Sequence, residues 1–316
     1  MEHSKRTIVV ALGGNALQQQ GEASSEAQQR VAAATARQIF PLIQAGHHVA
    51  IVHGNGPQVG NIVLHEEALN TPKVPSLPLS DCGAMSQGLI GAWLVRAFQK
   101  LARESGVDVP VVDVITHTIV DSADQAFANP SKPIGPFYSE EQAQQIAAEK
   151  GYVVKEDAGR GWRRVVPSPK PTSIVEAGVI KHLVDGGVTV ISTGGGGIPV
   201  LQQDDSLVGV DAVIDKDFGA AKLADLLGAD TLLILTAVEA ASINFNQPDE
   251  QPLGAVTVEE IQKHIDDGQF AAGSMLPKTR AAVQFVTGGQ DRLAIITSLE
   301  KTAEAIDGTA GTIVQS

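Results

Sequence analysis

The chain has 316 residues, of which 43% are hydrophobic and 19% are charged, and its formal net charge is −13. At about 150 residues per domain, this length allows two lobes or one large α/β domain. The acidic charge argues against a nucleic-acid surface, because such surfaces use lysine and arginine to neutralise phosphates. No apolar run approaches the roughly 20 residues that cross a bilayer, so we expect neither a nucleic-acid partner nor a membrane.

The first residues and the cysteine content predict a cytoplasmic protein. Residues 1–6 pass directly into an apolar run at 7–12, without the hydrophobic region and cleavage site of a secretory signal. Cys82 is the single cysteine, so no internal disulfide can form, which fits a reducing compartment. We expect Cys82 to be a partly buried residue near a helix start rather than a nucleophile.

Short runs rich in valine, isoleucine and leucine alternate with longer segments of helical period along most of the chain. This alternation is typical of a mainly parallel sheet covered by helices on both faces, so the expected fold class is α/β. The predicted strands are 7–12, 47–53, 109–116, 188–193, 231–237 and 292–297. The predicted helices are 24–45, 57–69, 81–105, 173–185, 216–228, 257–267 and 277–287. Several helices end with a glycine that suits a left-handed cap, namely Gly46, Gly106, Gly186, Gly228, Gly268 and Gly288.

The segment 121–171 interrupts this rhythm, because it contains several prolines around one short predicted helix. Within 150–170, lysines and arginines outnumber the acidic residues Glu156 and Asp157. Such a run of charge is often an exposed, solvated hairpin, and on charge alone this alternative stays open. In an acidic protein it is also one of the few places where an anionic ligand would meet concentrated positive charge.

Three predicted strands run directly into glycine-rich turns, at 12–16, 53–57 and 193–199. Glycine lets the backbone approach a ligand closely, and the amides of a following helix N-terminus favour anions. Ligands of open α/β sheets bind at the carboxyl ends of the strands, so the turns together predict one phosphate-binding edge. The turns match neither the Walker P-loop nor the dinucleotide fingerprint, which disfavours a Walker-type ATPase and a standard dehydrogenase.

Lysines adjoin turn residues at three places, as Lys132, Lys216 and Lys278. Phosphoryl transfer needs aligned reactants and positive charge on the transferred oxygens more than it needs covalent help. Lys216 lies between Asp215 and Asp217, which could hold its ammonium group in place. A single lysine is usually a solvated surface residue, so the prediction depends on the three together.

From Val9 to its C-terminus the chain resembles carbamate kinases of the amino-acid kinase superfamily. The glycine turns are shared by the whole superfamily. Two segments point to carbamate kinases in particular: Lys-Pro-Ile-Gly-Pro-Phe at 132–137 and Asp-Ala-Gly-Arg-Gly-Trp-Arg at 157–163. The other segments that carry the resemblance are 11–16, 53–61, 166–171, 213–218 and 273–278.

The resemblance implies a three-layer α/β/α sandwich, the amino-acid kinase fold, with a mainly parallel central sheet and a small protruding subdomain. It implies a lobe at 1–186 that binds carbamate or carbamoyl phosphate and contains the protruding subdomain at about 121–171. The remaining residues, 187–316, would form the nucleotide-binding lobe. This lobe would hold ATP or ADP with Mg²⁺, the metal being held mainly by the phosphates, and the protein would be a homodimer.

The resemblance also implies roles for individual residues. The implied catalytic residues are Asn15, Lys132, Lys216, Asp217 and Lys278. The implied substrate-binding residues are Gly13, Gly14, Gly54 and Asn55. The implied nucleotide-binding residues are Gly194, Gly195, Gly196, Gly197, Lys216, Thr236, Ala237 and Lys278. The lysines would bind phosphoryl oxygens and spread the transition-state charge, and the aspartate would orient them rather than act as a general base.

Two stretches depart from the pattern of the relatives. Residues 79–82 are Leu-Ser-Asp-Cys, which shifts a carboxylate by one position, and residues 237–240, beside the nucleotide base, are Ala-Val-Glu-Ala. The expected reaction is ATP + carbamate = ADP + carbamoyl phosphate, reversible and run towards ATP synthesis. Two alternatives stay open, namely a kinase for another carboxylate acceptor, such as acetylglutamate or aspartate, and a non-catalytic protein that binds carbamoyl phosphate or nucleotide.

Overall fold

The computed structural model describes residues 5–13, 17, 23–157 and 159–316. Its central sheet has eight strands in the order β15-β17-β16-β12-β1-β2-β9-β3. Within this sheet the described pairs are parallel, except β16 with β17. The strands are β1 (Thr7–Leu12), β2 (His48–His53), β3 (Val111–Val114), β9 (Thr189–Ser192), β12 (Thr231–Thr236), β15 (Ala255–Thr257), β16 (Leu293–Ser298) and β17 (Thr312–Gln315).

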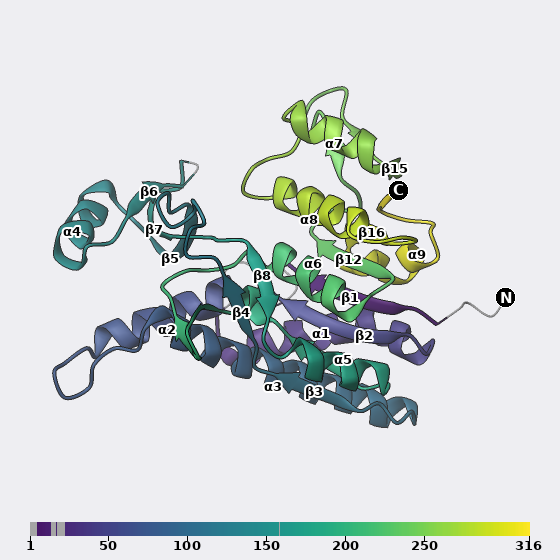
Figure 1. Ribbon diagram of the computed structural model, residues 1–316, viewed down its shortest axis with the longest axis horizontal. Coiled ribbons are helices and arrows are strands. Elements are labelled where there is room, and N and C mark those ends of the chain that lie inside the picture. The colour runs from purple at the N-terminus through teal and green to yellow at the C-terminus, as the bar shows by residue number, and fades with distance from the viewer. Residues whose placement is uncertain (1–4, 14–16, 18–22, 158) are drawn as a thin grey trace.

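Helices cover both faces of this sheet (Figure 1). Along β1, Ile8 and Val10 face one apolar core while Val9 and Ala11 face the other, which explains why the central strands are continuous apolar runs. The first core is covered by α1 (Ser25–Gln44), α3 (Leu79–Ser105) and α9 (Thr302–Ile306). The second is covered by α5 (Ala177–Asp185), α6 (Lys216–Leu227), α7 (Val258–Asp266) and α8 (Met275–Thr287). The predicted three-layer α/β/α sandwich is confirmed.

Smaller sheets lie outside the sandwich. A four-stranded sheet has the order β11 (Ser206–Gly209), β10 (Ile198–Gln203), β4 (His117–Val120), β8 (Pro171–Ile174). A three-stranded sheet of β5 (Lys132–Tyr138), β7 (Trp162–Val166) and β6 (Val154–Glu156) projects with α4 (Glu140–Lys150) away from the sandwich, near α2 (Gly56–Ala68) (Figure 1). A short pair, β13 (Ser242–Ile243) and β14 (Gln251–Pro252), completes the described strands, and short 3-10 turns span Gly194–Gly196 and Leu299–Lys301.

Local chemistry sets several helix starts. Ser139 and Thr257 each form a capping box at the starts of α4 and α7, and Asp215 caps α6 through its carboxylate. One predicted start was wrong, because residues 173–174 end β8 and the helix α5 begins only at Ala177. In the described ranges, no helix is long and apolar enough to cross a membrane.

The glycine caps were confirmed at four places and wrong at two. The left-handed φ angles are 84° at Gly46, 68° at Gly106, 66° at Gly228 and 71° at Gly268. Gly186 and Gly288 instead both have φ of −76°. After α5 the left-handed residue is the next glycine, Gly187, with φ of 82°.

Candidate functional site

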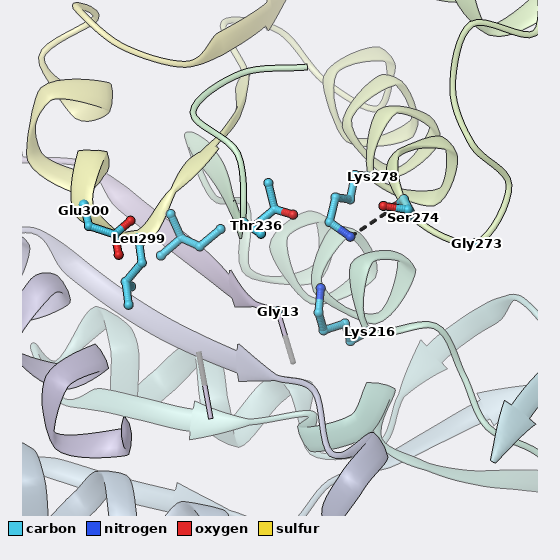
Figure 2. Close-up of a pocket in the computed structure, with 10 residues that line it drawn as sticks. Gly13, Lys216, Thr236, Gly273, Ser274, Lys278, Leu299 and Glu300 are labelled. Carbon is cyan, nitrogen blue, oxygen red and sulfur yellow. Dashed lines mark hydrogen bonds between the residues drawn. The ribbon is translucent and has the colours of Figure 1, made fainter. Parts of the chain in front are cut away.

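A cavity of about 550 Å³ opens at the carboxyl ends of β1 and β12 (Figure 2). Gly13 follows β1, Thr236 ends β12, Lys216 is the first residue of α6, and Lys278 lies in the first turn of α8. Parallel sheets bind ligands at this edge, as the glycine turns predicted. The lining consists of Gly13, Lys216, Leu235, Thr236, Ala237, Gly273, Ser274, Lys278, Leu299 and Glu300.

A buried carboxylate holds two lysines together at this cavity. Asp217 is 2% exposed; its Oδ1 accepts a hydrogen bond from Lys216 Nζ, and its Oδ2 accepts one from Lys278 Nζ at 3.2 Å. Lys278 Nζ also donates to the carbonyl oxygen of Ser274 at 3.2 Å (Figure 2). Burial lowers the pKa of Lys278, and the positive charge of Lys216 lowers it further. An anion in the cavity would offset this repulsion between the ammonium groups.

A third lysine joins them from the protruding sheet. Lys132, at the start of β5, donates from Nζ to Asp215 Oδ2 at 2.7 Å, while Asp215 Oδ1 accepts the backbone N–H of Asp217 at 2.9 Å. Burial alone would raise the pKa of Asp215, but the charges of Lys132 and Lys216 outweigh it and hold this pKa below its ordinary value. Two aspartates at the start of α6 therefore gather lysines from three elements.

A smaller cavity of about 220 Å³ lies on the other side of the lysines. Its wall includes Gly54 and Asn55 at the end of β2, Lys132 on β5 and Gly195 in the glycine turn after β9. The two cavities share Lys216, Gly273, Ser274 and Lys278. The lysines thus stand where two bound reactants would meet, which is the alignment that phosphoryl transfer requires.

The glycine turn at 194–197 closes tightly on this smaller cavity. Gly195 has φ of 64°, and a Cβ there would lie 2.2 Å from Asn55 Nδ2, so no larger residue fits beside that side chain. Asn55 is itself held by a hydrogen bond from Nδ2 to Ser86 Oγ at 2.8 Å. The other three glycines pack against neighbouring residues. At Gly194, a Cβ would lie 2.5 Å from His53 Nε2. At Gly196 it would lie 2.5 Å from the carbonyl oxygen of Ile214, and at Gly197 it would lie 2.0 Å from Thr118 Oγ1.

An adjoining cavity of about 390 Å³ extends the larger one away from the lysines. The two share Thr236, Ala237 and Ser274. Phe245, Phe270 and other apolar side chains line the adjoining cavity together with the amides of Asn244 and Gln269. Apolar walls with a few polar groups suit a planar heterocycle, so the pair of cavities can hold a base at one end and phosphates at the other.

A fourth cavity of about 940 Å³ lies between the protruding sheet and α8 and leads to the lysine cluster. It shares Lys132, Asp215 and Ser274 with the smaller cavity. Five cations and two carboxylates line it: Lys132, Arg160, Arg163, Lys170 and Arg280, with Asp157 and Asp215. In a protein of net charge −13 this is a local region of positive charge. We call it the cationic approach.

Most predicted site residues line these cavities. Of the four glycines predicted to bind nucleotide, only Gly195 lines one of them, the smaller cavity, while Gly194, Gly196 and Gly197 line none. Gly14 and Asn15 lie outside the described residues. Cys82 is completely buried in α3 rather than partly buried as expected, and burial, followed by the charges of Glu66 and Asp81, raises its pKa to about 11. Such a thiol is not a nucleophile.

Several cavity residues were not predicted from the sequence. The quoted segments already contained Asp215 and Ser274, but only as neighbours of lysines. Leu299 and Glu300 follow the carboxyl end of β16, where no glycine turn marks the strand end.

Known kinases are similar to this chain over nearly its whole length. The sequence profile of the amino acid kinase family matches residues 6–297. The carbamate kinase of Latilactobacillus sakei is 51% identical over 314 residues, covering 98% of this chain and 99% of that protein. The carbamate kinase of Pyrococcus furiosus is 51% identical over 311 residues, covering 98% and 99%. The solved structure of Giardia lamblia carbamate kinase bound to AMP-PNP is similar with a TM-score of 0.91 and 45% identity, covering 100% of this chain and 99% of that one.

Proposed function

The chain belongs to the amino acid kinase family and, within it, to the carbamate kinases, and from this premise we propose how its residues carry the reaction. The enzyme catalyses ATP + carbamate = ADP + carbamoyl phosphate. The observation that carries the site assignment is the cluster of Lys132, Lys216 and Lys278 around Asp215 and Asp217, between a larger and a smaller cavity.

Each cavity takes one part of the reactants. The cavity with Phe245 and Phe270 holds the adenine base, and the cavity of Figure 2 holds the nucleotide phosphates beside Gly13 and the lysines. The smaller cavity, with Gly54 and Asn55, holds carbamate or the carbamoyl end of carbamoyl phosphate. The family resemblance assigns Gly14 and Asn15, next to Gly13 in the sequence, to the transferred phosphoryl group.

The chemistry needs charge neutralisation rather than proton transfer. A carbamate oxygen attacks the γ-phosphorus of ATP while the bond from that phosphorus to the bridging oxygen of ADP breaks, and in reverse an ADP oxygen attacks carbamoyl phosphate. The carbamate oxygen is already an anion, so no proton has to be removed and Asp217 serves to orient Lys216 and Lys278. The ammonium groups stabilise the negative charge on the transferred oxygens.

The donor set fits Mg²⁺ held mainly by phosphates. Among the described residues there is no group of three histidine, cysteine, aspartate or glutamate side chains placed to hold a metal. The nearby carboxylates of Asp215 and Asp217 are already bonded to lysines. Mg²⁺ is commonly bound through substrate phosphates with few protein ligands, and when bound it neutralises part of their charge.

The wider organisation follows the same proposal. Residues 1–186 form the lobe for carbamate, with the protruding subdomain at about 121–171, and residues 187–316 form the nucleotide lobe, although β9 of this second part lies between β2 and β3 in the sheet. The enzyme is a cytoplasmic homodimer that runs towards ATP synthesis.

A panel of acceptors tests the choice of carbamate. With ATP and Mg²⁺, the enzyme should form ADP with carbamate and only background amounts with acetate, acetylglutamate or aspartate. Faster turnover with one of those carboxylates would overturn the carbamate assignment. Thermal stabilisation by carbamoyl phosphate or ADP without any phosphoryl transfer would show a binding protein instead.

The positive charge of the cationic approach predicts that the rate of carbamoyl phosphate binding depends on salt concentration. Arg160 and Arg163 are bonded to Asp157, whereas Lys170 and Arg280 are exposed cations on opposite walls. Replacing both Lys170 and Arg280 by alanine should lower kcat/KM for carbamoyl phosphate about three- to tenfold at low ionic strength, with a smaller change in kcat, because clustered charge raises association rates. The difference should shrink in high salt.

The matched control removes the same charges elsewhere. Arg37 in α1 and Lys73 in the loop after α2 are also exposed, so Arg37→Ala with Lys73→Ala should leave kcat/KM near the wild-type value. The kcat/KM of both double variants is measured with stopped or coupled assays at several salt concentrations. An equal salt dependence in wild type and in the Lys170 and Arg280 double variant would contradict the steering role.

A further inference from the structure

Four side chains outside these cavities attach the protruding sheet to α2. Glu67, near the end of α2, accepts a hydrogen bond from Lys150 Nζ at 2.6 Å and one from Tyr152 Oη at 2.7 Å. The guanidinium of Arg164 lies 3.7 Å from the centre of the Tyr152 ring and 4.0 Å from Glu67 Oε1. We call these residues the Glu67 cluster.

Within the Glu67 cluster the carboxylate and the guanidinium are largely shielded from solvent. The side chains of Glu67 and Arg164 are 20% and 13% exposed, and that of Lys150 is 39% exposed. Burial alone would raise the pKa of Glu67, but the hydrogen bonds from Lys150 and Tyr152 and the nearby positive charges hold it below its ordinary value. Burial and the bond to Glu67 raise the pKa of Tyr152 to about 12. The carboxylate is therefore ionised and the phenol is a donor at neutral pH.

The same helix also contacts β5 directly. A Cβ on Gly60 would lie 3.4 Å from the Cα of Gly135, so the backbones of α2 and β5 approach closely. Val59 packs with Ile134 in a small apolar cluster between the helix and the protruding sheet. These contacts hold α2 and β5 close together, and the Glu67 cluster attaches the C-terminal end of α2 to the protruding sheet.

The strand register connects this attachment to the lysine site. Arg164 of β7 pairs with Ile134 of β5, and Lys132 stands two residues before Ile134 on the same strand, paired with Val166. At its other end α2 begins beside Asn55, which lines the smaller cavity. One helix thus carries substrate-side residues at its start and the anchor of the lysine-bearing sheet at its end.

We propose that Glu67 is a positioning residue for Lys132: its hydrogen bonds to Lys150 and Tyr152 and its ion pair with Arg164 hold the protruding sheet so that Lys132 reaches the phosphoryl group. This inference rests on the proposed role of Lys132 and deepens it. Glu67 touches no reactant and acts through the sheet.

A double-mutant cycle separates positioning from general stability. Glu67→Ala should lower kcat for ATP formation about ten- to hundredfold, the size expected when a reacting group is misplaced by an ångström or so, while KM for ADP changes little because the protruding sheet does not line the nucleotide cavities. Glu67→Gln, which keeps one hydrogen bond, should cost less. In a Lys132→Ala background, Glu67→Ala should add almost nothing, whereas full additivity would overturn the inference.

Glu66 supplies the matched control. It is the neighbouring residue on α2 and accepts the backbone N–H of Leu77 at 3.1 Å, so it contacts the loop after the helix instead of the protruding sheet. Glu66→Gln should therefore leave kcat near the wild-type value. A loss of kcat equal to that of Glu67→Gln would point to the helix as a whole and would overturn the specific role of Glu67.

The position of Lys132 can also be measured without turnover. In the wild type its ammonium is bonded to Asp215, which should slow acylation by an amine-reactive reagent. Peptide mass spectrometry should find Lys132 labelled several-fold faster in Glu67→Ala, slightly faster in Tyr152→Phe, and at the wild-type rate in Glu66→Gln. Unchanged labelling in Glu67→Ala would overturn the inference, whereas failure of the wild type to form ATP would count against the proposed function alone.

Discussion

Replacing Lys278 by alanine should lower the turnover number for ATP formation by about a thousandfold, and Lys216→Ala should do the same. Each lysine places an ammonium group at the junction of the two cavities, with a side chain that is 13% exposed. Charges aimed at the transferred phosphoryl group contribute on the order of 10²- to 10⁵-fold in related chemistry, because little water remains to replace them. The measurement is ATP formation from saturating Mg²⁺-ADP and carbamoyl phosphate.

Lys222, on the same helix as Lys216, provides the control for this loss of turnover. Lys222 of α6 is paired with Asp225 at 3.8 Å and lines none of the four cavities. Lys222→Ala should keep turnover within about twofold of the wild type, as expected for a weak surface pair. If Lys278→Ala and Lys216→Ala also stayed within tenfold, the lysine cluster would not be the transfer site.

Asp217→Asn should damage both stability and turnover. The carboxylate is 2% exposed and neutralises two lysines, so its loss leaves two largely buried cations without the negative charge that they share. Removing one member of a buried ionic group costs about 3–5 kcal/mol, which should lower Tm by several degrees in a thermal unfolding experiment. Turnover should fall by orders of magnitude, since no carboxylate then orients Lys216 and Lys278 at the cavity.

The rise in Tm with added inorganic phosphate distinguishes the loss of this neutralising charge from ordinary misfolding. With the carboxylate gone, the uncompensated lysines should bind an added anion more strongly, so phosphate should raise the Tm of Asp217→Asn more than that of the wild type. Asp266→Asn, at an exposed position of α7 where the carboxylate accepts a bond from Gln262, should change neither the Tm nor its response to phosphate. Equal stabilisation of Asp217→Asn and wild type by phosphate would contradict the assignment of Asp217 as the residue that neutralises both lysines.

The inner strands of the central sheet were predictable because they are buried on both faces, whereas β15 and β17, at one side of the sheet, were not predicted. The predicted strands at 7–12 and 231–237 correspond to β1 and β12, which differ from the predictions by at most one residue, since apolar runs bounded by turn residues mark such strands clearly. The four-stranded sheet was missed because β4, β8 and β11 are short and carry polar residues. Those strands depend on their partners across the fold rather than on a local pattern.

Residues of the proposed site were predicted from the sequence, but their pairings were not. The three lysines and several residues of the glycine turns line the proposed cavities, and the family resemblance implies their roles. Lys132 and Asp215, however, are 83 positions apart and meet only in the folded chain. Glu67 was missed for the same reason, because its partners are 83 and 85 positions away on the protruding sheet. No local sequence pattern indicates contacts of this kind.

The most direct test of the account is ATP formation by the purified 316-residue chain from ADP, Mg²⁺ and carbamoyl phosphate. We expect ATP to form far above the background rate with the wild type, to fall close to background with Lys278→Ala, and to remain at background when acetyl phosphate replaces carbamoyl phosphate. Wild-type ATP formation at the background rate would contradict the assignment of this lysine cluster as a carbamate kinase site.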